Sequence, residues 1–490
     1  MQRTLLSAEN VTVFFGTRRI FRIEKIEIRE GDRIGLVGMN GSGKTTLLEL
    51  FSGKLAPDGG TLTLNCEPGY FRQLAGNEES WASAEEKSLF GVRELVGNPS
   101  VSGGEGTRLR LAELFCGESA LCLIDEPTSH LDEEGVKYLS QRLWSIETFV
   151  LVSHDRDLLD AQCDSIIEIE DGEVKRYEGN YSSYLEQKKR AFERARFEYE
   201  RYSDEMERLT AAYRAKKEQA GNVAKKPRGM SSSEAKVRDF SSMRRSPKGK
   251  AKGLERSAEN IKKRMEHMEV REKPKELPKI RPLFSLTDPP RNPIIMEAEN
   301  LSFAYPNGRE IFANAVFRLK RGSRTVLLGG NGSGKTTLIR LILEGELIRI
   351  VPKAKLGYLR QDLSDLDDSL SVLECANETS VQPKTVVRNV LARLLFSASD
   401  IEKPVAVLSG GERVRLAFAR IFVSSANVLV LDEPTNYLDI PSVEAIQALL
   451  SEYEGTLLFA SHDRAFVRAV ATDALLIENK KIVEYDLNDF

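Results

Sequence analysis

The sequence predicts an α/β protein made of two similar domains that are joined by a long α-helical coiled-coil hairpin. Three observations support this fold. The chain has 490 residues, more than one hydrophobic core usually serves. One ordered set of short motifs occurs twice, and the segment between the two copies is rich in charged residues with helical periodicity. We therefore expect a first domain at 1–180, a linker at 181–290 and a second domain at 291–490.

The two copies keep the same order and spacing of motifs, which indicates a duplication. The first copy contains Gly38-Met39-Asn40-Gly41-Ser42-Gly43-Lys44-Thr45-Thr46, then Gln73, Ser102-Gly103-Gly104-Glu105, Asp125-Glu126 and His154. The second copy contains Gly329-Gly330-Asn331-Gly332-Ser333-Gly334-Lys335-Thr336-Thr337, then Gln361, Ser409-Gly410-Gly411-Glu412, Asp432-Glu433 and His462. In each copy 24 residues separate the serine of the SGGE motif from the glutamate of the Asp-Glu pair.

Each copy opens with the pattern GxxxxGK[ST], which is typical of a loop that binds phosphate groups. Its glycines let backbone N–H groups close around the phosphates at the start of a helix, and its lysine reaches the β and γ groups. Lys44 and Lys335 take this place. The hydroxyls of Thr45 and Thr336 are predicted Mg²⁺ ligands, because a hard cation prefers oxygen. The pattern thus predicts two sites for ATP with Mg²⁺.

The Asp-Glu pairs follow two apolar runs, 121–124 and 428–431, that read as buried parallel strands. Ligands bind at the carboxyl ends of such strands. We expect Asp125 and Asp432 to support the metal, and Glu126 and Glu433 to act as general bases on the attacking water. The alternative is that these acids are solvated strand ends.

One histidine and one glutamine complete each predicted site. His154 and His462 also follow apolar runs, at 28 and 29 residues beyond the glutamates, which favours a γ-phosphate contact over a structural role. Gln73 and Gln361 follow aromatic-containing segments and are candidate ligands of the metal or of water.

Composition narrows the class of protein. The net charge of −3 favours neither a nucleic-acid binder nor an acidic tail. The five cysteines lack CxxC spacing, so we interpret them as core residues of a protein from a reducing compartment. We find neither a signal peptide nor an apolar run of about 18 residues, and we therefore expect a cytoplasmic protein without a membrane domain.

The linker is predicted to form a helical hairpin. Apolar residues recur every seven positions in a first helix of about 35 residues, at Leu185, Phe192, Tyr199, Met206 and Tyr213. A returning helix carries the same 4-3 spacing at Leu254, Ala258, Ile261, Met265 and Met268, and Pro274 is expected to end it. Between 212 and 264 there are 17 Lys and Arg against 5 Asp and Glu, so this segment carries +12 and the rest of the chain −15. Such a segment attracts RNA phosphates, although a charge run is often only a solvated helix face.

The SGGE motifs resemble the signature of ATP-binding-cassette proteins, and the resemblance covers both domains. In that family two cassettes pair head to tail, which implies here a monomer with intramolecular pairing. Lys44 would then face 409–412, and Lys335 would face 102–105. Phe15 and Tyr305 resemble the aromatic residue that stacks on adenine, although either could be a core residue. Asp132 and Asp439 match the loop through which the two sites communicate.

Two fused cassettes with a charged helical linker and no membrane span resemble class F of this family, the translation factors that enter the ribosomal tRNA exit site. The first cassette has only 27 residues from Thr46 to Gln73, which leaves no room for the arm insertion of some housekeeping members of the class. The linker, by contrast, is long. These features are similar to the antibiotic-resistance ribosome-protection group. The resemblance implies the 70S ribosome, its 23S rRNA and the P-site tRNA as partners, and protection from lincosamide, streptogramin A and pleuromutilin antibiotics.

The tip of the linker, about 219–250, holds the candidate contacts with RNA or the drug site. They are Lys225, Lys226, Arg228, Phe240, Met243, Arg244 and Arg245. Phe240 and Met243 could instead attach a short tip helix to the arm. Three other functions stay open: a housekeeping translation factor of the same class, the ATPase subunit of a transporter, and a coiled-coil chromosome ATPase, which would interrupt one cassette with its coil.

Overall fold

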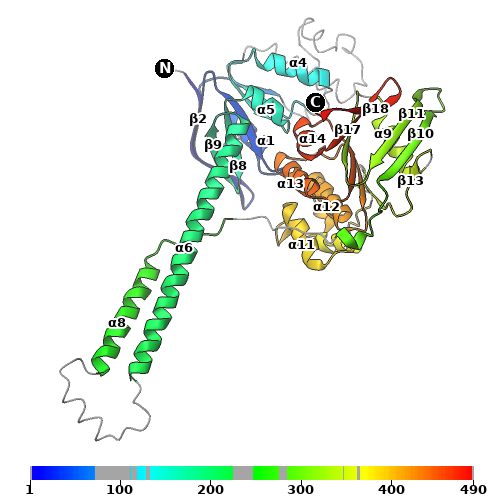
Figure 1. The fold of residues 1–490 in the computed structure, drawn as a ribbon. Coiled ribbons are helices and arrows are strands. Elements are labelled where there is room, and N and C mark those ends of the chain that lie inside the picture. The colour runs from blue at the N-terminus through cyan, green and yellow to red at the C-terminus, as the bar shows by residue number, and fades with distance from the viewer. Residues whose placement is uncertain are drawn as a thin grey trace, which may run out of the picture. The chain divides into compact units, whose positions relative to one another are not determined.

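The computed structural model divides the chain into two compact units. The larger contains Met1–Tyr184 and Leu277–Phe490, and the smaller contains Leu185–Glu276. The residues that the structure describes are 3–71, 111, 119–128, 133–224, 247–274, 284–330, 332–345, 347–360, 363, 365–436 and 438–487. The larger unit thus holds both copies of the repeated motifs, and the smaller holds most of the linker helices (Figure 1).

The first copy is built on a nine-stranded sheet in the order β4-β1-β2-β9-β8-β3-β7-β6-β5. Its elements are β1 (Thr4–Phe15), β2 (Arg18–Arg29), β3 (Arg33–Gly38), α1 (Lys44–Phe51), β4 (Gly59–Leu64), β5 (Gly69–Phe71), β6 (Cys122–Asp125), α4 (Glu133–Leu143), β7 (Phe149–Val152), α5 (Arg156–Gln162), β8 (Ser165–Glu170) and β9 (Glu173–Glu178). Strands β5, β6, β7, β3 and β8 run parallel, whereas β1 pairs antiparallel with β2 and β4. The predicted buried parallel strand before Asp125 is therefore confirmed as β6, whose four residues are all buried.

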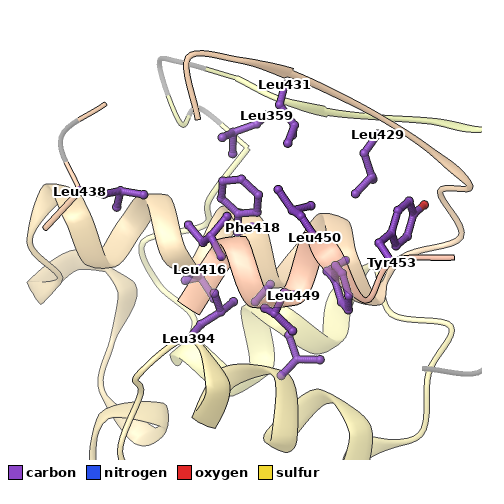
Figure 2. Packing of buried hydrophobic residues seen from close by; sticks show 14 of the residues in the cluster. Leu359, Leu394, Leu416, Phe418, Leu429, Leu431, Leu438, Leu449, Leu450 and Tyr453 are labelled. Atoms are coloured by element: carbon purple, nitrogen blue, oxygen red, sulfur yellow. The ribbon is translucent and has the colours of Figure 1, made fainter. Parts of the chain in front are cut away.

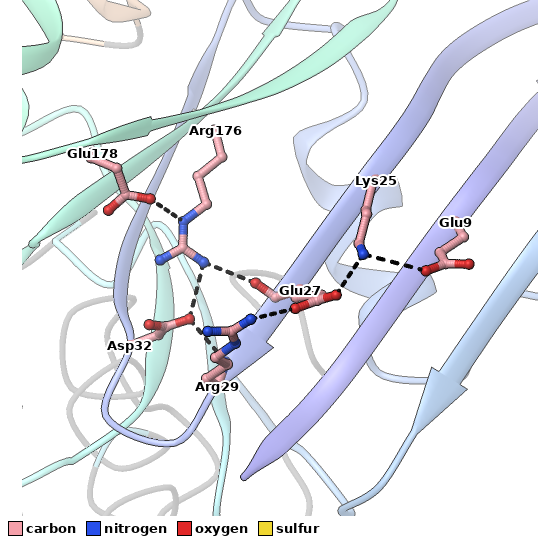
Figure 3. Close-up of polar contacts among 7 residues, drawn as sticks. All are labelled: Glu9, Lys25, Glu27, Arg29, Asp32, Arg176 and Glu178. Atoms are coloured by element: carbon pink, nitrogen blue, oxygen red, sulfur yellow. Dashed lines mark hydrogen bonds and ion pairs between the residues drawn. The ribbon is translucent and has the colours of Figure 1, made fainter. Parts of the chain in front are cut away.

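Charged side chains cross the exposed face of this sheet where β1, β2 and β9 lie side by side (Figure 3). Lys25 lies 2.9 Å from Glu27 and 3.7 Å from Glu9, and Arg176 lies 3.0 Å from Asp32. Arg176 also donates to the carbonyl of Glu27 at 2.8 Å. Exposed pairs such as those of Lys25 contribute little stability, so this network mainly keeps the face polar.

The second copy has the same chain order but divides into two sheets. Strands β10 (Ile294–Ala304), β11 (Glu310–Lys320) and β13 (Arg349–Ile350) form one sheet, and β14 (Leu356–Leu359), β15 (Val428–Asp432), β16 (Thr456–Ala460), β12 (Arg324–Leu328), β17 (Asp473–Glu478) and β18 (Lys481–Tyr485) form the other. The helices are η2 (Phe284–Thr287), α9 (Lys335–Glu344), α10 (Val372–Glu378), α11 (Lys384–Arg393), η3 (Asp400–Glu402), η4 (Val405–Val407), α12 (Gly410–Val423), α13 (Ile440–Ser451) and α14 (Arg464–Val470). The buried run predicted at 428–431 is confirmed as β15, which pairs parallel with β14 and β16.

The largest core of the second copy lies between its parallel sheet and the helices that follow. Figure 2 shows Leu416 and Phe418 of α12 facing Leu449 and Leu450 of α13, with Leu359 of β14 nearby. All five are less than a tenth exposed. Removing a buried aromatic ring such as that of Phe418 costs about 3–5 kcal/mol, so this core fixes α12 and its SGGE start against the sheet.

The linker forms two antiparallel helices, α6 (Tyr181–Ala224) and α8 (Pro247–Glu266) (Figure 1). Arg264 of α8 contacts Glu205 of α6 at 2.9 Å, and Arg271 beyond α8 contacts Glu198 at 3.6 Å. These contacts lie seven residues apart on both segments, as a heptad pairing requires. Leu209, Ala220, Ala251 and Ala258 are buried between the helices. The predicted coiled-coil hairpin is confirmed.

Two details of the linker prediction were wrong. Helix α6 has 44 residues, not about 35, because it continues past Tyr213, the last residue of the predicted seam, to Ala224, with Ala220 still buried. Helix α8 ends at Glu266, eight residues before the proline expected to end it. The N–H of Met268 bonds the carbonyl of Met265 at 3.3 Å, an i→i+3 contact of the kind that closes the last turn of a helix.

Within the described residues, no helix combines the length and the apolar character that a membrane crossing requires. Of the cysteines there, Cys122, Cys163 and Cys375 are buried and Cys66 is partly exposed. Cys116 lies outside the described part of the chain.

Candidate nucleotide-binding sites

Both phosphate-loop helices begin without a side-chain cap. Helix α1 starts after Gly43 and α9 after Gly334, at φ angles of 102° and 116°, and no side chain bonds their first N–H groups. By contrast, Asp155, Asp439 and Asp463 cap α5, α13 and α14. A Cβ at Gly43 would meet Ile20 at 2.6 Å, so the turn requires glycine. The two uncapped N-termini therefore have N–H groups available for an anion.

The polar side chains of the loops fit a triphosphate. The Nζ of Lys44 lies 2.8 Å from the carbonyl of Gly38, and that of Lys335 lies 2.7 Å from the carbonyl of Gly329. Both amines thus sit inside their own loops. The hydroxyls of Ser42 and Ser333 are buried without a hydrogen-bond partner among the described residues, which is unusual for buried oxygen atoms. Phosphate oxygens would supply the partner that each hydroxyl lacks.

A threonine and an aspartate meet behind each loop. The Thr45 hydroxyl donates to Asp125 at 2.9 Å. Burial raises the pKa of Asp125, although the Thr45 hydrogen bond opposes this shift. Burial likewise raises the pKa of Asp432, against the opposing effect of Thr336, and one carboxylate oxygen of Asp432 is buried without a described partner. Two adjacent oxygen donors of this kind suit Mg²⁺, which would neutralise phosphate charge there.

Each Asp-Glu pair ends in a glutamate that contacts the histidine of the same copy. His154 Nε2 lies 2.9 Å from Glu126, and His462 Nε2 lies 3.3 Å from Glu433. Both glutamates have a φ of 49°, in the left-handed region that side chains rarely adopt. Such strain persists only where the surroundings hold it, and it is common at functional sites. Neither motif signals this backbone geometry, which occurs in both copies beside a carboxylate that contacts a histidine.

One hydrogen bond joins the two copies at the first phosphate loop. Asp439, the cap of α13, accepts from the backbone N–H of Asn40 at 2.5 Å and from that of Ser442 at 2.9 Å. Although burial opposes the shift, these hydrogen bonds hold the pKa of Asp439 below its ordinary value. Ile440, the next residue, lies in a core cluster with residues of the first copy. The second copy therefore supplies part of the surroundings of the Lys44 site.

Two further polar contacts attach α13 to the first copy. Arg156 of α5 donates to Gln447 at 3.2 Å, and the hydroxyl of Tyr181, the first residue of α6, donates to Glu444 at 3.4 Å. Neither contact was predicted, since the residues belong to no motif.

The two candidate adenine-stacking residues have different surroundings. Phe15 ends β1 with 79% of its surface exposed. Tyr305, one residue after β10, is partly buried, and its hydroxyl lies 2.9 Å from that of Thr337. Arg340 lies over the Tyr305 ring at 5.1 Å, and Phe303 packs edge-on at 5.3 Å. Sequence reasoning missed Arg340 and Phe303, although comparison of the copies shows Glu49 where the second has Arg340.

The SGGE motif of the second copy begins α12 as a capping box. The backbone N–H and hydroxyl of Ser409 donate to Glu412 at 2.8 and 2.6 Å. Among the described residues, no hydrogen bond joins these two to the Lys44 loop, and the expected facing arrangement stays a prediction. The predicted residues outside the described part are Gln73, Ser102, Gly103, Gly104, Glu105, Asp132, Lys225, Lys226, Arg228, Phe240, Met243, Arg244, Arg245, Asn331 and Gln361.

Comparison with known proteins agrees with this geometry. The family described as ABC transporter matches residues 23–94 and 312–436. The ribosome protection protein VmlR of Bacillus subtilis is 33% identical, over 99% of this chain and 89% of its own length. The chain belongs to class F of the ATP-binding-cassette family.

Two more similarities extend this result. The erythromycin resistance ATP-binding protein MsrA of Staphylococcus epidermidis is 35% identical, over 92% of this chain and 93% of its own length. A solved structure of the RNase-L inhibitor covers 98% of this chain, and this chain covers 91% of it, with a TM-score of 0.64 and 17% identity. The expected pair of ATP-binding cassettes is confirmed, and this class F protein is an ATPase.

Proposed function

We propose that this class F ATPase binds two Mg-ATP molecules between its cassettes and protects the ribosome from antibiotics that target the peptidyl-transferase centre. It would act in the cytoplasm on the 70S ribosome, entering the tRNA exit site and contacting 23S rRNA and the P-site tRNA. The drugs would be of lincosamide, streptogramin A and pleuromutilin type. The functional parts would be cassettes at 1–180 and 291–490 and the arm at 181–290.

The observation that carries the proposal is the similarity of nearly the whole chain to a named ribosome protection protein. VmlR matches 99% of this chain, arm included, and MsrA, named for erythromycin resistance, matches 92%. A match to a transporter ATPase would extend over the cassettes alone. The basic arm adds independent physical support, because it carries +12 in a chain whose remainder carries −15.

Exposed cations on the described arm helices fit contact with RNA. Lys250, Lys252 and Arg256 of α8 are exposed, and within the described residues they have no ion-pair partner. We extend this role to the tip residues Lys225, Lys226, Arg228, Phe240, Met243, Arg244 and Arg245, which would approach the drug site.

The chemistry proposed for each cassette follows from its own residues. Lys44 and Lys335 bind the β and γ phosphates, together with the uncapped N–H groups of α1 and α9. Thr45 with Asp125, and Thr336 with Asp432, would hold Mg²⁺, which neutralises phosphate charge when bound. Gln73 and Gln361 would complete the metal or water shell.

The glutamates act on water. Glu126 and Glu433 take its proton as it attacks the γ-phosphate, and His154 and His462 orient these carboxylates and contact the phosphate. The other cassette's SGGE motif closes each site, and Asp439 carries the state of the first site to the second cassette.

The test is a ribosome-binding experiment with a variant that cannot hydrolyse ATP. Glu126→Gln/Glu433→Gln protein should sediment with 70S ribosomes in ATP and remain in the supernatant without nucleotide. A second variant tests the arm by replacing Lys250, Lys252 and Arg256 with glutamine. This change should weaken ribosome binding, most clearly at moderate salt. A variant that stayed free of ribosomes at low ionic strength would overturn the proposal.

A resistance assay then separates the two remaining functions. Cells that express the wild-type protein should tolerate lincosamides and pleuromutilins better than cells that express the double glutamine variant. Ribosome binding without any change in drug tolerance would instead indicate a housekeeping translation factor. Copurification with membrane proteins in place of ribosomes would indicate a transporter subunit.

A further inference from the structure

The nucleobase side of the second ATP site has a support that the first site lacks. Tyr305 is held at three points: its hydroxyl by Thr337 at 2.9 Å, its edge by Phe303 at 5.3 Å, and one ring face by Arg340 at 5.1 Å. Arg340 itself lies 3.5 Å from Glu344. A ring fixed on one face and at its rim keeps its other face in a defined direction.

One face of α9 supplies two of the three contacts, those of Thr337 and Arg340, whereas Phe303 belongs to β10. Thr337, Arg340 and Glu344 lie three and four residues apart on α9, so their side chains follow one stripe along it. The same helix begins at Lys335 of the phosphate loop. One helix therefore connects the phosphate loop of the second site with the Tyr305 ring, which would serve as a platform for the adenine base.

The first site differs at each of these positions. Phe15 takes the place of Tyr305, so the hydroxyl that could bond Thr46 is missing. Val13 takes the place of Phe303, and Glu49 takes the place of Arg340, which reverses the charge. Within the described part of the chain, Phe15 has neither a cation–π partner nor a stacking ring; it lies opposite Arg18 in the β1–β2 pair, with 79% of its surface exposed.

We propose that Arg340 is a positioning residue that fixes Tyr305 as a platform for the base, so that the base contributes more to ATP affinity at the second site than at the first. This inference rests on the proposed ATP site and on Tyr305 stacking on adenine there, the role that the family resemblance implies. A preformed platform loses less side-chain freedom when a ligand binds, which favours affinity. The phosphate loops also differ, because Asp439 bonds the first loop at Asn40, so the contribution of the base has to be measured separately from that of the phosphates.

The experiment measures each site separately in the full-length protein without ribosomes. A Lys44→Ala background leaves the second site, and a Lys335→Ala background leaves the first. Two probes are titrated by calorimetry with Mg²⁺: ATP, and inorganic triphosphate, which has no base. The ratio of ATP affinity to triphosphate affinity, which isolates the contribution of the base, should be larger at the second site than at the first.

Arg340→Met keeps the length of the side chain and removes its charge. In the Lys44→Ala background it should weaken ATP binding about two- to fivefold, the loss expected for one cation–π contact, and leave triphosphate binding unchanged. The matched control is Arg349→Met, an exposed cation of the same cassette that contacts Glu297 instead of a ring. Phe15→Tyr/Glu49→Arg in the Lys335→Ala background should tighten ATP binding to the first site.

The outcomes separate this inference from the role of Tyr305. If Tyr305→Ala leaves ATP affinity unchanged, Tyr305 does not stack on the base, and its place in the proposed ATP site is wrong. If Tyr305→Ala weakens ATP binding but Arg340→Met does not, only the positioning role fails. If Arg340→Met weakened the binding of ATP and of triphosphate equally, the effect would be a general structural one and the inference would be overturned. Tighter ATP binding in Arg340→Met protein would overturn it as well.

Discussion

The two nucleotide sites share their phosphate chemistry and differ around it. Each has an uncapped helix, a lysine inside its loop and a strained glutamate facing a histidine. The first site receives Asp439 from the other cassette, and the second has a supported tyrosine. After a duplication, the groups that touch phosphates are constrained by the reaction, whereas the groups that adjust affinity can diverge. The sites therefore need not hydrolyse at equal rates.

The largest effect should come from the two glutamates. Glu126→Gln and Glu433→Gln each remove one general base, and the double variant should lose about 10²–10⁴-fold of the ATPase rate. Steady-state phosphate release from the two single variants shows how the rate divides between the sites. Glu454→Gln, an exposed change in the second cassette, is the control. A double variant with an unchanged rate would remove both glutamates from the mechanism.

Asp439 tests whether the first site depends on the other cassette. Asp439→Ala removes a buried acceptor from the N–H of Asn40, and ATP binding to the first site should weaken about tenfold, as expected for a hydrogen bond to a charged group. ATP titration in the Lys335→Ala background measures this loss. Ser371→Ala removes a helix cap far from Asn40 in sequence and should leave ATP binding unchanged. Equal weakening by both changes would indicate only a loss of stability.

The pH dependence of the second site should reveal its buried glutamate. Burial raises the pKa of Glu433 above its ordinary value of 4.5, against opposing effects of His462 and Lys335. A base must be ionised to accept a proton, so activity is lost as pH falls through this raised pKa. In Glu126→Gln protein the acid limb of kcat/KM should therefore lie above pH 4.5. A limb at or below that value would show that Glu433 is not the titrating base.

The smallest expected effect is on stability. A carboxyl with a raised pKa in the folded state costs stability once it is ionised, and this cost disappears as pH falls through the folded pKa toward 4.5. Glu433→Gln removes the charge, so the nucleotide-free protein should unfold at a slightly higher temperature at pH 7. Calorimetry at pH 7 and pH 5 measures the difference, which should shrink at the lower pH. A lower Tm at pH 7 would contradict this account.

Sequence reasoning predicted the parts of this protein that repeat. Two copies of one motif series were enough to predict the two cassettes, and the heptads at Leu185–Tyr213 predicted the coiled coil. Both signals lie within short stretches of the chain and can be read without knowing the fold. Contacts between distant segments could not be predicted this way. Asp439 and Asn40 are 399 residues apart, and only the folded chain brings them together. The left-handed glutamates also escaped prediction, since glutamate has no preference for that conformation.

Helix α13 connects the first phosphate loop with the start of α6. Asp439 at its first turn bonds Asn40, and Glu444, five residues later, accepts from Tyr181. A helix of 44 residues is about 66 Å long at 1.5 Å per residue. By simple leverage, a tilt of about 5° at Tyr181 displaces the far end of α6 by about 6 Å, given that length.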